Sequence, residues 1–503
     1  MPTTIVGTTV KLASTCALAL ALGACSRALT VAVNPYEIAL PPGGTQVFRG
    51  WVSAESPLTS TALSWAADRG LIAGTGETVT YTAPTTMGPD AVTATSRSDA
   101  SQSATATVTV TTTGARVWAR QFGSGEYMHD EAHGIAADAA SNVLVVGSTV
   151  GNLAGTNVGG RDAFVRMYDP DGREVWTRQF GTSEDDVAVA VALDPSGNVL
   201  VVGATHGDLA GESAGDSDAF VRKYDALGTE LWTRQFGSGH GDRASGVAVD
   251  AAGNVVVVGS AGGSLTGGAP AAGDGGAFVR TYDALGTELW TRQFGSGHGD
   301  RASGVAVDAA GNVVVAGSTM GSLAGTNLGG ADAYVRTYDA AGTEGWVRQF
   351  GTDANDSASG VAVDPSGRVL IVGTTRWGGW GQPWIETSGF VRCFDAAGSE
   401  LWDRPIDVDQ VFDGLAIAVD GFGDTLITRT VGSNGPSNTV VVKFDASGGE
   451  RWSRRVGTTT TDHATAVAVD AAANVFVGGI TEYRLDALWG GIRTDAFVWR
   501  FSP

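Results

Sequence analysis

Residues 224–257 read YDALGTELWTRQFGSGHGDRASGVAVDAAGNVVV, and residues 282–315 repeat this stretch without a single change. Self-similarity at a fixed spacing is typical of repeat architectures, in which every repeat is one supersecondary unit. The local structure of this one stretch therefore decides the fold of the region around it.

Weaker copies of the same pattern run through the C-terminal part of the chain. Two markers define them, an anchor tryptophan and an aspartate that ends an apolar run, and both markers occur seven times. The tryptophans are Trp118, Trp176, Trp232, Trp290, Trp346, Trp402 and Trp452, and the aspartates are Asp138, Asp194, Asp250, Asp308, Asp364, Asp420 and Asp470. The sequence therefore predicts seven structural units.

One unit consists of four short apolar runs separated by turns rich in Asp, Asn and Gly. The runs are residues 246–250, 255–258, 219–224 and 231–236. The first two are almost continuously apolar, which is typical of strands in a sheet that is buried on both faces. Helical periodicity is absent from the repeat. We therefore expect each unit to be a four-stranded antiparallel sheet.

Seven such units predict an all-β domain over residues 115–503, a seven-bladed β-propeller. The region begins with a lone outer-strand sequence at residues 115–122 and ends with a lone third-strand sequence at residues 496–501. Closing a ring of sheets protects strand edges. We therefore expect the N-terminal strand to complete and close the last blade.

The repeat is similar to the bacterial seven-bladed β-propeller repeat family. The similarity rests on Asp162–Arg166 (DAFVR), Tyr168, Trp176, Gln179–Gly181 and Asn198–Gly203 with their copies, over residues 116–503. The resemblance implies the propeller fold and an exported or surface-associated protein. It implies no particular activity.

A smaller β-rich segment, residues 31–112, precedes the repeats. Short alternating runs separated by turns predict a β-sandwich. Residues 34–45, Ser64-Trp65 and Tyr81–Pro84 resemble bacterial Ig-like domains of cell-surface proteins. That resemblance implies an adhesion module or a spacer, and both alternatives stay open.

Residues 1–24 have the features of a lipoprotein-type signal peptide. The apolar stretch 12–22 is too short to span a membrane. Leu22-Gly-Ala-Cys25 resembles the bacterial lipobox, which implies lipid attachment at Cys25 and a short tether over residues 25–30. We expect an exported outer-membrane or cell-surface lipoprotein, with a periplasmic or secreted protein as the alternative.

Composition narrows the possible partners. The chain of 503 residues has 53 acidic and 32 basic side chains and a net charge of −21. Nucleic-acid-binding proteins carry basic patches, so this balance argues against that class.

We expect no cofactor, membrane contact only through the lipid, and a monomer. Of three cysteines, only Cys393 remains after processing and lipidation, so no internal disulfide is expected.

The two rims of a propeller built from this repeat differ. The turns between the first and second and between the third and fourth strands are short and alike. The other loops, here called the loop rim, are longer and vary, as binding loops on rigid scaffolds do. We expect any ligand site on the loop rim or at the mouth of the central channel.

Six aspartates recur in the loop rim, eight residues before the aspartate that ends the apolar run: Asp130, Asp186, Asp242, Asp300, Asp356 and Asp462. One interpretation is an acidic ring that attracts Ca²⁺, another cation or a basic partner. The favoured interpretation is structural, with each carboxylate accepting backbone N–H groups and bracing its loop.

Departures from the repeat give the ligand-binding candidates. Trp377, Trp380 and Trp384 lie in one Gly-rich loop, and Trp489 lies in the corresponding loop of the last unit. Such a cluster is suited to sugar stacking or to a protein contact, or it fills a small core of its own. His129 and His133 flank two acids and are weak metal candidates.

No Walker loop or dinucleotide motif occurs in the chain. Catalytic residues cannot be selected from the sequence, and a non-enzyme is favoured. The predicted function is a binding or scaffolding propeller that recognises protein or glycan through the loop rim. The alternative is an exported hydrolase or carbohydrate lyase with its site at the channel mouth.

Overall fold

The computed structural model describes residues 30–34, 36–53, 62–112, 114–125, 128–266, 275–377, 386–406, 415–431, 437–458, 460–484 and 492–503. The signal peptide (1–24) and Cys25 with most of its tether lie outside these ranges. All regular secondary structure within the ranges is β-strand. They contain no helix of the length and apolarity that a membrane span requires.

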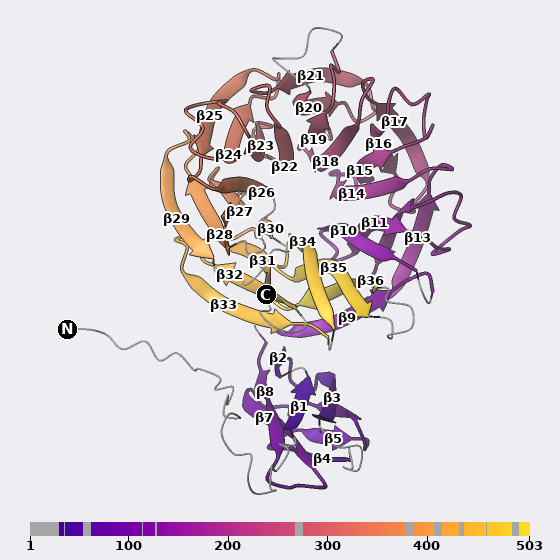
Figure 1. Cartoon of the computed structure of the whole chain (residues 1–503), viewed down its shortest axis with the longest axis vertical. Helices are drawn as coiled ribbons and strands as arrows, with labels where there is room; N and C mark the ends of the chain where they lie inside the picture. Colours follow the sequence, from indigo (N-terminus) through magenta and orange to yellow (C-terminus); the bar gives the residue numbers. More distant parts are fainter. Residues whose placement is uncertain are drawn as a thin grey trace, which may run out of the picture.

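Residues 116–501 form seven four-stranded antiparallel sheets, which we number ring sheets 1 to 7. Figure 1 shows them arranged around a centre, with the first strand of each sheet innermost and the last outermost. The all-β class and the four-stranded antiparallel units predicted from the repeat are confirmed.

The bounds of the strands follow the repeat closely. Ring sheet 1 holds β10 (Asp130–Ala137), β11 (Val143–Thr149), β12 (Asp162–Tyr168) and β13 (Glu174–Phe180). Ring sheet 2 holds β14 (Asp186–Leu193), β15 (Val199–Thr205), β16 (Asp218–Tyr224) and β17 (Glu230–Phe236). Ring sheet 3 holds β18 (Asp242–Val249), β19 (Val255–Ala261), β20 (Gly276–Tyr282) and β21 (Glu288–Phe294). Ring sheet 4 holds β22 (Arg301–Val307), β23 (Val313–Thr319), β24 (Asp332–Tyr338) and β25 (Glu344–Phe350).

The remaining ring sheets have the same order of strands. Ring sheet 5 holds β26 (Asn355–Val363), β27 (Val369–Trp377), β28 (Glu386–Phe394) and β29 (Glu400–Ile406). Ring sheet 6 holds β30 (Ala416–Val419), β31 (Thr425–Val431), β32 (Asn438–Phe444) and β33 (Glu450–Val456). Ring sheet 7 holds β34 (Thr461–Val469), β35 (Val475–Arg484), β36 (Ile492–Phe501) and, as its outermost strand, β9 (Arg116–Phe122).

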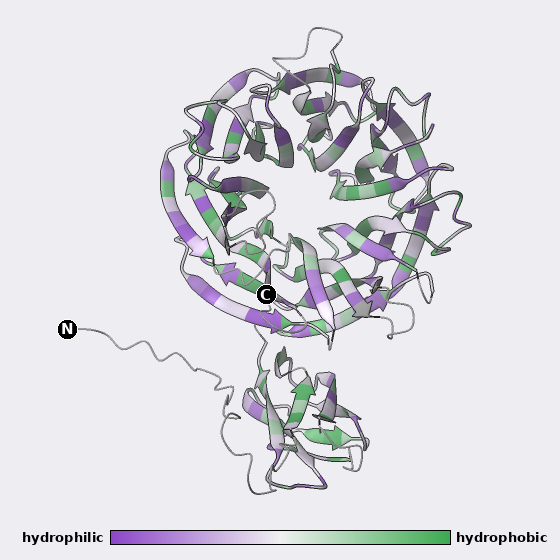
Figure 2. Cartoon of the chain, viewed as in Figure 1, coloured by the Kyte–Doolittle hydropathy of each residue, from purple (hydrophilic) through white to green (hydrophobic). Residues whose placement is uncertain are grey.

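The middle strands of the ring sheets form the core. Every residue of β11, β12, β15 and β16 is buried, because neighbouring sheets cover both of their faces. The outer strands face solvent on one side, and Figure 2 shows hydrophilic segments along β29 and β33. The continuous apolar runs of the sequence thus correspond to the strands that are covered on both faces.

The short turns are held by their own aspartates. In ring sheet 2, Asp194 Oδ1 accepts a hydrogen bond from the amide of Asn198 at 2.9 Å, and the Asn198 side chain donates to Asp194 Oδ2 at 2.8 Å. Gly197 closes this turn with a left-handed φ of 81°. Ser141 and Ala473 occupy the corresponding position in ring sheets 1 and 7, at φ 65° and 61°.

The anchor tryptophans connect each ring sheet to the next. Trp176 Nε1 donates a hydrogen bond to the carbonyl of Ala226, in a turn of ring sheet 2, at 3.1 Å. Arg178 donates to the Gly228 carbonyl in the same turn at 2.8 Å and lies over the Trp176 ring. A Cβ on Gly228 would come within 2.9 Å of that ring, so the turn requires glycine there.

Ring sheet 7 combines both ends of the repeat region. β36 pairs antiparallel with β9, and Ala496 lies opposite Phe122. On its other side, the Thr465 hydroxyl donates to the carbonyl of Ala132 in ring sheet 1 at 2.7 Å. Trp118 of β9 packs against Tyr168 of ring sheet 1. The N-terminal strand is therefore the outer strand of the last sheet.

Two further sheets lie before the ring. One has the strand order β1 (Thr30–Asn34), β3 (Thr45–Ser53), β6 (Thr78–Thr82) and β5 (Leu71–Ala73). The other has the order β2 (Glu37–Leu40), β8 (Ser103–Val110), β7 (Gly88–Ser96) and β4 (Leu63–Ala67). Phe48 and Tyr81 from the first sheet share one buried core with Val92 and Val108 from the second. This is a sandwich of two sheets.

The sandwich contacts the ring beside β9. The Arg116 side chain donates a hydrogen bond to Gln46 of the sandwich. Arg455 of β33 lies over the ring of Tyr36, with its guanidinium carbon 5.0 Å from the ring centre. Burial lowers the pKa of Arg116 to about 10.

Candidate functional site

The six repeated aspartates of the loop rim are buried. All of them are at most 5% exposed, and each lies at or next to the first residue of an innermost strand. In ring sheet 2, the amide and the hydroxyl of Thr182 both donate to Asp186 Oδ2, at 2.6 and 3.0 Å. The equivalent donors elsewhere are Ser124, Ser238, Ser296, Thr352 and Thr458.

These carboxylates therefore brace the loops from inside, and they do not form a solvent-facing acidic ring. They lie at the strand ends, not in the loops where the repeat pattern predicts them. Burial raises the pKa of Asp186 and Asp242, and it raises the pKa of Asp462 to about 6. Gly181 passes between Asp186 and Asp162, where a Cβ would lie within 3 Å of both carboxylates.

In ring sheets 1, 2 and 4, a glutamine from the outer strand fixes the long loop beside it. Gln179 Oε1 accepts the amides of Leu153 and Ala154, at 2.8 and 3.1 Å. Its Nε2 donates to the carbonyl of Gly151 and to Asp162 Oδ2, both at 2.9 Å. Gln235 and Gln349 make the same four contacts in their sheets. The long loops of ring sheets 1, 2 and 4 are thus held in place by the scaffold.

Exposed apolar side chains stand on these anchored loops. Val158 in ring sheet 1 and Met320 and Leu328 in ring sheet 4 are 63%, 56% and 59% exposed. Their backbones are held, since the amide of Met320 donates to the His298 carbonyl and that of Leu328 to Asp332. These three side chains are not among the candidates predicted from the sequence. For Met320, the signal was a departure from the repeat, because His206 and Gly262 occupy its position in ring sheets 2 and 3.

Of the four tryptophan candidates, the structure describes only Trp377. It ends β27, is 39% exposed and pairs in register with Glu386. Trp380, Trp384 and Trp489 lie outside the described residues, so the proposed cluster stays a prediction.

The two histidine candidates have different neighbours. His129 Nδ1 lies 3.2 Å from the hydroxyl of Thr494 in ring sheet 7. His133 Nε2 lies 3.4 Å from the Ser148 hydroxyl and 3.8 Å from Glu131. Burial lowers the pKa of His133, which favours its neutral form. Within the described ranges, no group of three or more His, Cys, Asp or Glu side chains could hold a metal ion.

The innermost strands surround a central cavity of about 300 Å³. Each ring sheet contributes three consecutive residues to its wall, for example Ser303-Gly304-Val305 from β22. In six of the sheets the first residue of this stretch is the one skipped at a register shift. His133, Ser245, Ser359 and Thr465 add polar side chains to the wall.

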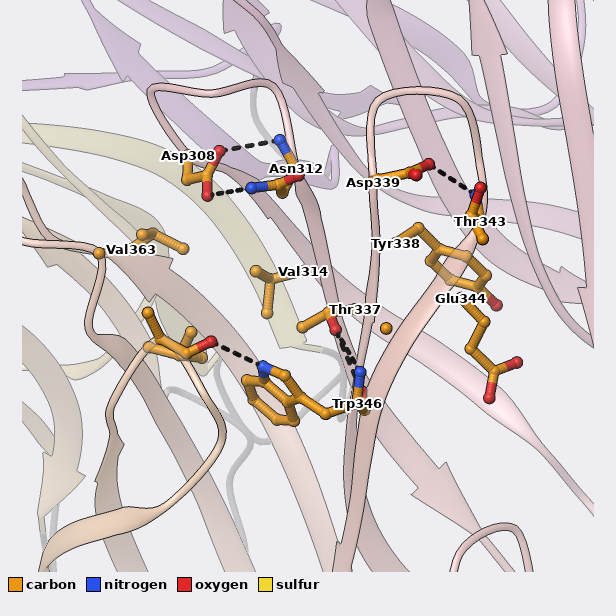
Figure 3. A pocket seen from close by; sticks show the side chains of 14 residues that line it. Asp308, Asn312, Val314, Thr337, Tyr338, Asp339, Thr343, Glu344, Trp346 and Val363 are labelled. Carbon is orange, nitrogen blue, oxygen red and sulfur yellow. Dashed lines mark hydrogen bonds between the residues drawn. The ribbon is translucent and has the colours of Figure 1, made fainter.

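A second cavity, of about 310 Å³, opens between ring sheets 4 and 5 at the short-turn rim. Figure 3 shows Asp308 and Asn312 on one turn, Asp339 and Thr343 on another, and Trp346 below them. Trp346 Nε1 donates to the carbonyl of Ala396 at 3.0 Å. We call this cavity the turn-rim pocket. The short, uniform turns of the repeat predict a structural role only, so this pocket is not apparent from the sequence.

Comparison with known proteins gives the class of the chain. The family described as Beta-propeller repeat matches residues 117–154, 175–210 and 345–376. Together with the ring sheets, these matches support a β-propeller repeat protein. The regulatory protein FlaEY of Caulobacter vibrioides (strain ATCC 19089 / CIP 103742 / CB 15) is 32% identical over 181 residues. This match covers 33% of the chain and only 19% of FlaEY.

Solved structures show distant similarity of shape. Polysaccharide lyase Uly1 has a TM-score of 0.43 and 12% identity, covering 78% of this chain and 92% of that chain. A PL25 ulvan lyase has a TM-score of 0.42 and 10% identity, covering 75% and 95%. BBS1N in complex with ARL6DN has a TM-score of 0.43 and 9% identity, covering 78% and 98%.

Proposed function

We propose that this protein is an exported, lipid-anchored cell-surface protein whose seven-bladed propeller binds a protein or glycan partner without catalysis. The Ig-like sandwich holds the propeller away from the membrane, and the lipid is attached at Cys25. The loop rim is the binding face, with Trp377, Trp380, Trp384 and Trp489 as candidate contacts.

The observation that carries this proposal is the construction of the loop rim. When a partner covers exposed apolar side chains, their removal from water favours binding. Val158, Met320 and Leu328 stand exposed on loops whose backbones are fixed by buried aspartates and glutamines. A preformed surface loses little conformational entropy on binding, which favours affinity.

The test is a binding screen of the full-length protein against glycans and extracted cell-surface proteins. Met320→Asp and Leu328→Asp are expected to weaken the binding of the partner at least tenfold. The matched control is Leu285→Asp, because Leu285 is 77% exposed but lies in a short turn on the opposite rim. Equal loss in the control, or no loss in either variant, contradicts the proposed binding face.

Two further measurements test the alternative catalytic function and the lipid anchor. Turnover of a glycan that is abolished by His133→Ala would favour a hydrolase or lyase at the channel instead. Metabolic labelling with palmitate tests the lipid, since labelling is expected for the native protein and not for Cys25→Ser.

A further inference from the structure

Ring sheet 2 contains a buried binding position for an ammonium group, here called the seat. Lys223 extends from the third strand, and its Nζ lies 2.8 Å from Asp194 Oδ2 in the turn after the first strand. The same Nζ donates to the carbonyl of Ala284, in a turn of ring sheet 3, at 3.1 Å. That carbonyl also accepts the indole N–H of Trp232. The seat thus consists of a carboxylate from one sheet and a carbonyl from the next.

Other ring sheets place a cation of their own at the equivalent groups. In ring sheet 6, Lys443 Nζ lies 3.0 Å from Asp420. In ring sheet 5, the equivalent of Lys223 is Cys393, and Arg368 instead bridges Asp364 and the carbonyl of Ala446. The seat is therefore a recurring binding position for cationic side chains.

Ring sheet 4 has the seat but not the lysine. Asp308 binds its turn as Asp194 does, with Oδ1 on the Asn312 amide and Oδ2 on the Asn312 side chain. The carbonyl of Ala396 accepts the Trp346 indole as Ala284 accepts that of Trp232. Thr337 stands where Lys223 stands, and its hydroxyl bonds to the backbone of Trp346.

The turn-rim pocket opens at this position. Asp308, Thr337 and Ala396 all line it. So does Gly345, which replaces the Leu231 of ring sheet 2 and presents no side chain to the pocket. Asp194 is buried beneath Lys223, whereas Asp308 is half-buried. A group entering the pocket therefore reaches the same carboxylate and carbonyl that hold Lys223.

We propose that the turn-rim pocket binds a primary alkylammonium group, the head of a lysine side chain from a partner or of a small free amine. The ammonium would bind Asp308 Oδ2 and the Ala396 carbonyl, as Lys223 binds their equivalents. The carboxylates of Asp339 and Glu344 also line the pocket and attract a cation. This site lies on the rim opposite the loops, so it is independent of the proposed function.

The experiment is a calorimetric titration of the full-length protein with Nα-acetyl-lysine methylamide and, separately, with n-butylamine. A dissociation constant on the order of 1 mM is expected for one ion pair with a few hydrogen bonds. The norleucine analogue, which lacks the amine, is expected to bind at least tenfold more weakly. Tighter binding of the lysine compound than of butylamine assigns the site to a peptide, and the reverse assigns it to a free amine.

Two variants test the seat itself. Thr337→Lys supplies the side chain of ring sheet 2 and is expected to abolish amine binding and raise the melting temperature. Thr281→Lys is the same change in ring sheet 3 and is expected to leave the affinity of the turn-rim pocket within twofold. Asp308→Asn keeps an oxygen for the turn amides and is expected to weaken binding at least tenfold.

Undiminished amine binding by Thr337→Lys or by Asp308→Asn would overturn the proposal. Equal binding of the lysine and norleucine compounds would overturn it too, and so would no heat from either amine. Loop-rim binding can persist in all of these cases, so failure here is distinguishable from failure of the proposed function.

Discussion

Aspartate has two separate structural roles in this chain, and its surroundings decide which. Asp194 and its equivalents close short turns, and in ring sheet 2 the hydrogen bonds of Lys223 and Asn198 outweigh burial and lower the pKa of Asp194. Asp462 and its equivalents brace the loops with neutral donors only. Without a cation nearby, burial dominates and the pKa of Asp462 is raised to about 6.

Asp462 makes the stability of the ring depend on pH. Its pKa is near 3.8 when unfolded and about 6 when folded. Between these values the folded state binds more protons, so stability falls as pH rises from 4 to 6 and then levels off. The loss attributable to Asp462 is about 3 kcal/mol as an upper bound. Asp462→Asn should flatten this part of the profile, measured by urea unfolding at pH 4.5 and 6.5. A profile as steep as that of the native protein would contradict the assignment.

Ala473 is strained in its turn. Its φ of 61° lies in the left-handed region, where the equivalent turns of ring sheets 2 to 6 have glycine. Ala473→Gly should therefore raise the free energy of unfolding by about 0.5–1 kcal/mol. Gly311→Ala, at the equivalent turn of ring sheet 4, should lower it by a similar amount. Thermal melts of both variants check the prediction, and a change of the same sign in both would refute it.

At the scale of the element, the apolar runs and turn residues predicted the four strands of each unit. They did not predict where the innermost strands begin or bend. β18 begins at Asp242, several residues before the predicted apolar run at 246–250, because the buried aspartate pairs within the sheet. A simple alternation of apolar and polar side chains also does not predict the register shift between Ala244 and Gly246. Both features depend on contacts across strands.

Outer-strand glutamines are expected to determine the order of the adjacent loops. Gln235→Ala removes the acceptor for the amides of Leu209 and Ala210. Hydrogen exchange of the Ala210 amide should accelerate at least tenfold, because the described structure shows no other acceptor for it. The Leu209 amide should respond less, because it also donates to the Gly207 carbonyl at 3.2 Å. The amides of Leu323 and Ala324, held by Gln349, are the internal control and should not change. Faster exchange in both loops would indicate general destabilisation instead.

At the scale of the whole molecule, the repeat predicted a domain of successive sheets, and the lone strand sequences at its two ends predicted their pairing. The turn-rim pocket could not be predicted, because it arises between two sheets and depends on which side chain fills a shared position. Thr337 occupies the position of Lys223, and Gly345 lies in the next strand. Only the three-dimensional arrangement shows that both residues line one pocket.

Removing β9 should cost far more than removing the sandwich. Trp118 of β9 packs against both Phe476 of ring sheet 7 and Tyr168 of ring sheet 1. Loss of a buried tryptophan alone costs about 3–5 kcal/mol. A chain starting at Gly114 should keep a cooperative melt, whereas one starting at Ser124 should lose it. Circular dichroism melts distinguish the two, and identical melts would show that β9 does not hold the ring together.

The pairing of β9 with β36 also bears on how the chain finds its native arrangement. Residues 224–257 and 282–315 are identical, so during folding each copy can take the other's place beside a neighbouring sheet, and misassembly of this kind is characteristic of repeat proteins. An arrangement that skips one unit leaves a sheet without a neighbour. Only the complete succession of sheets brings Arg116 beside Phe501. The terminal pairing thus stabilises the correct assembly selectively, because the last strand pair is complete only in that arrangement.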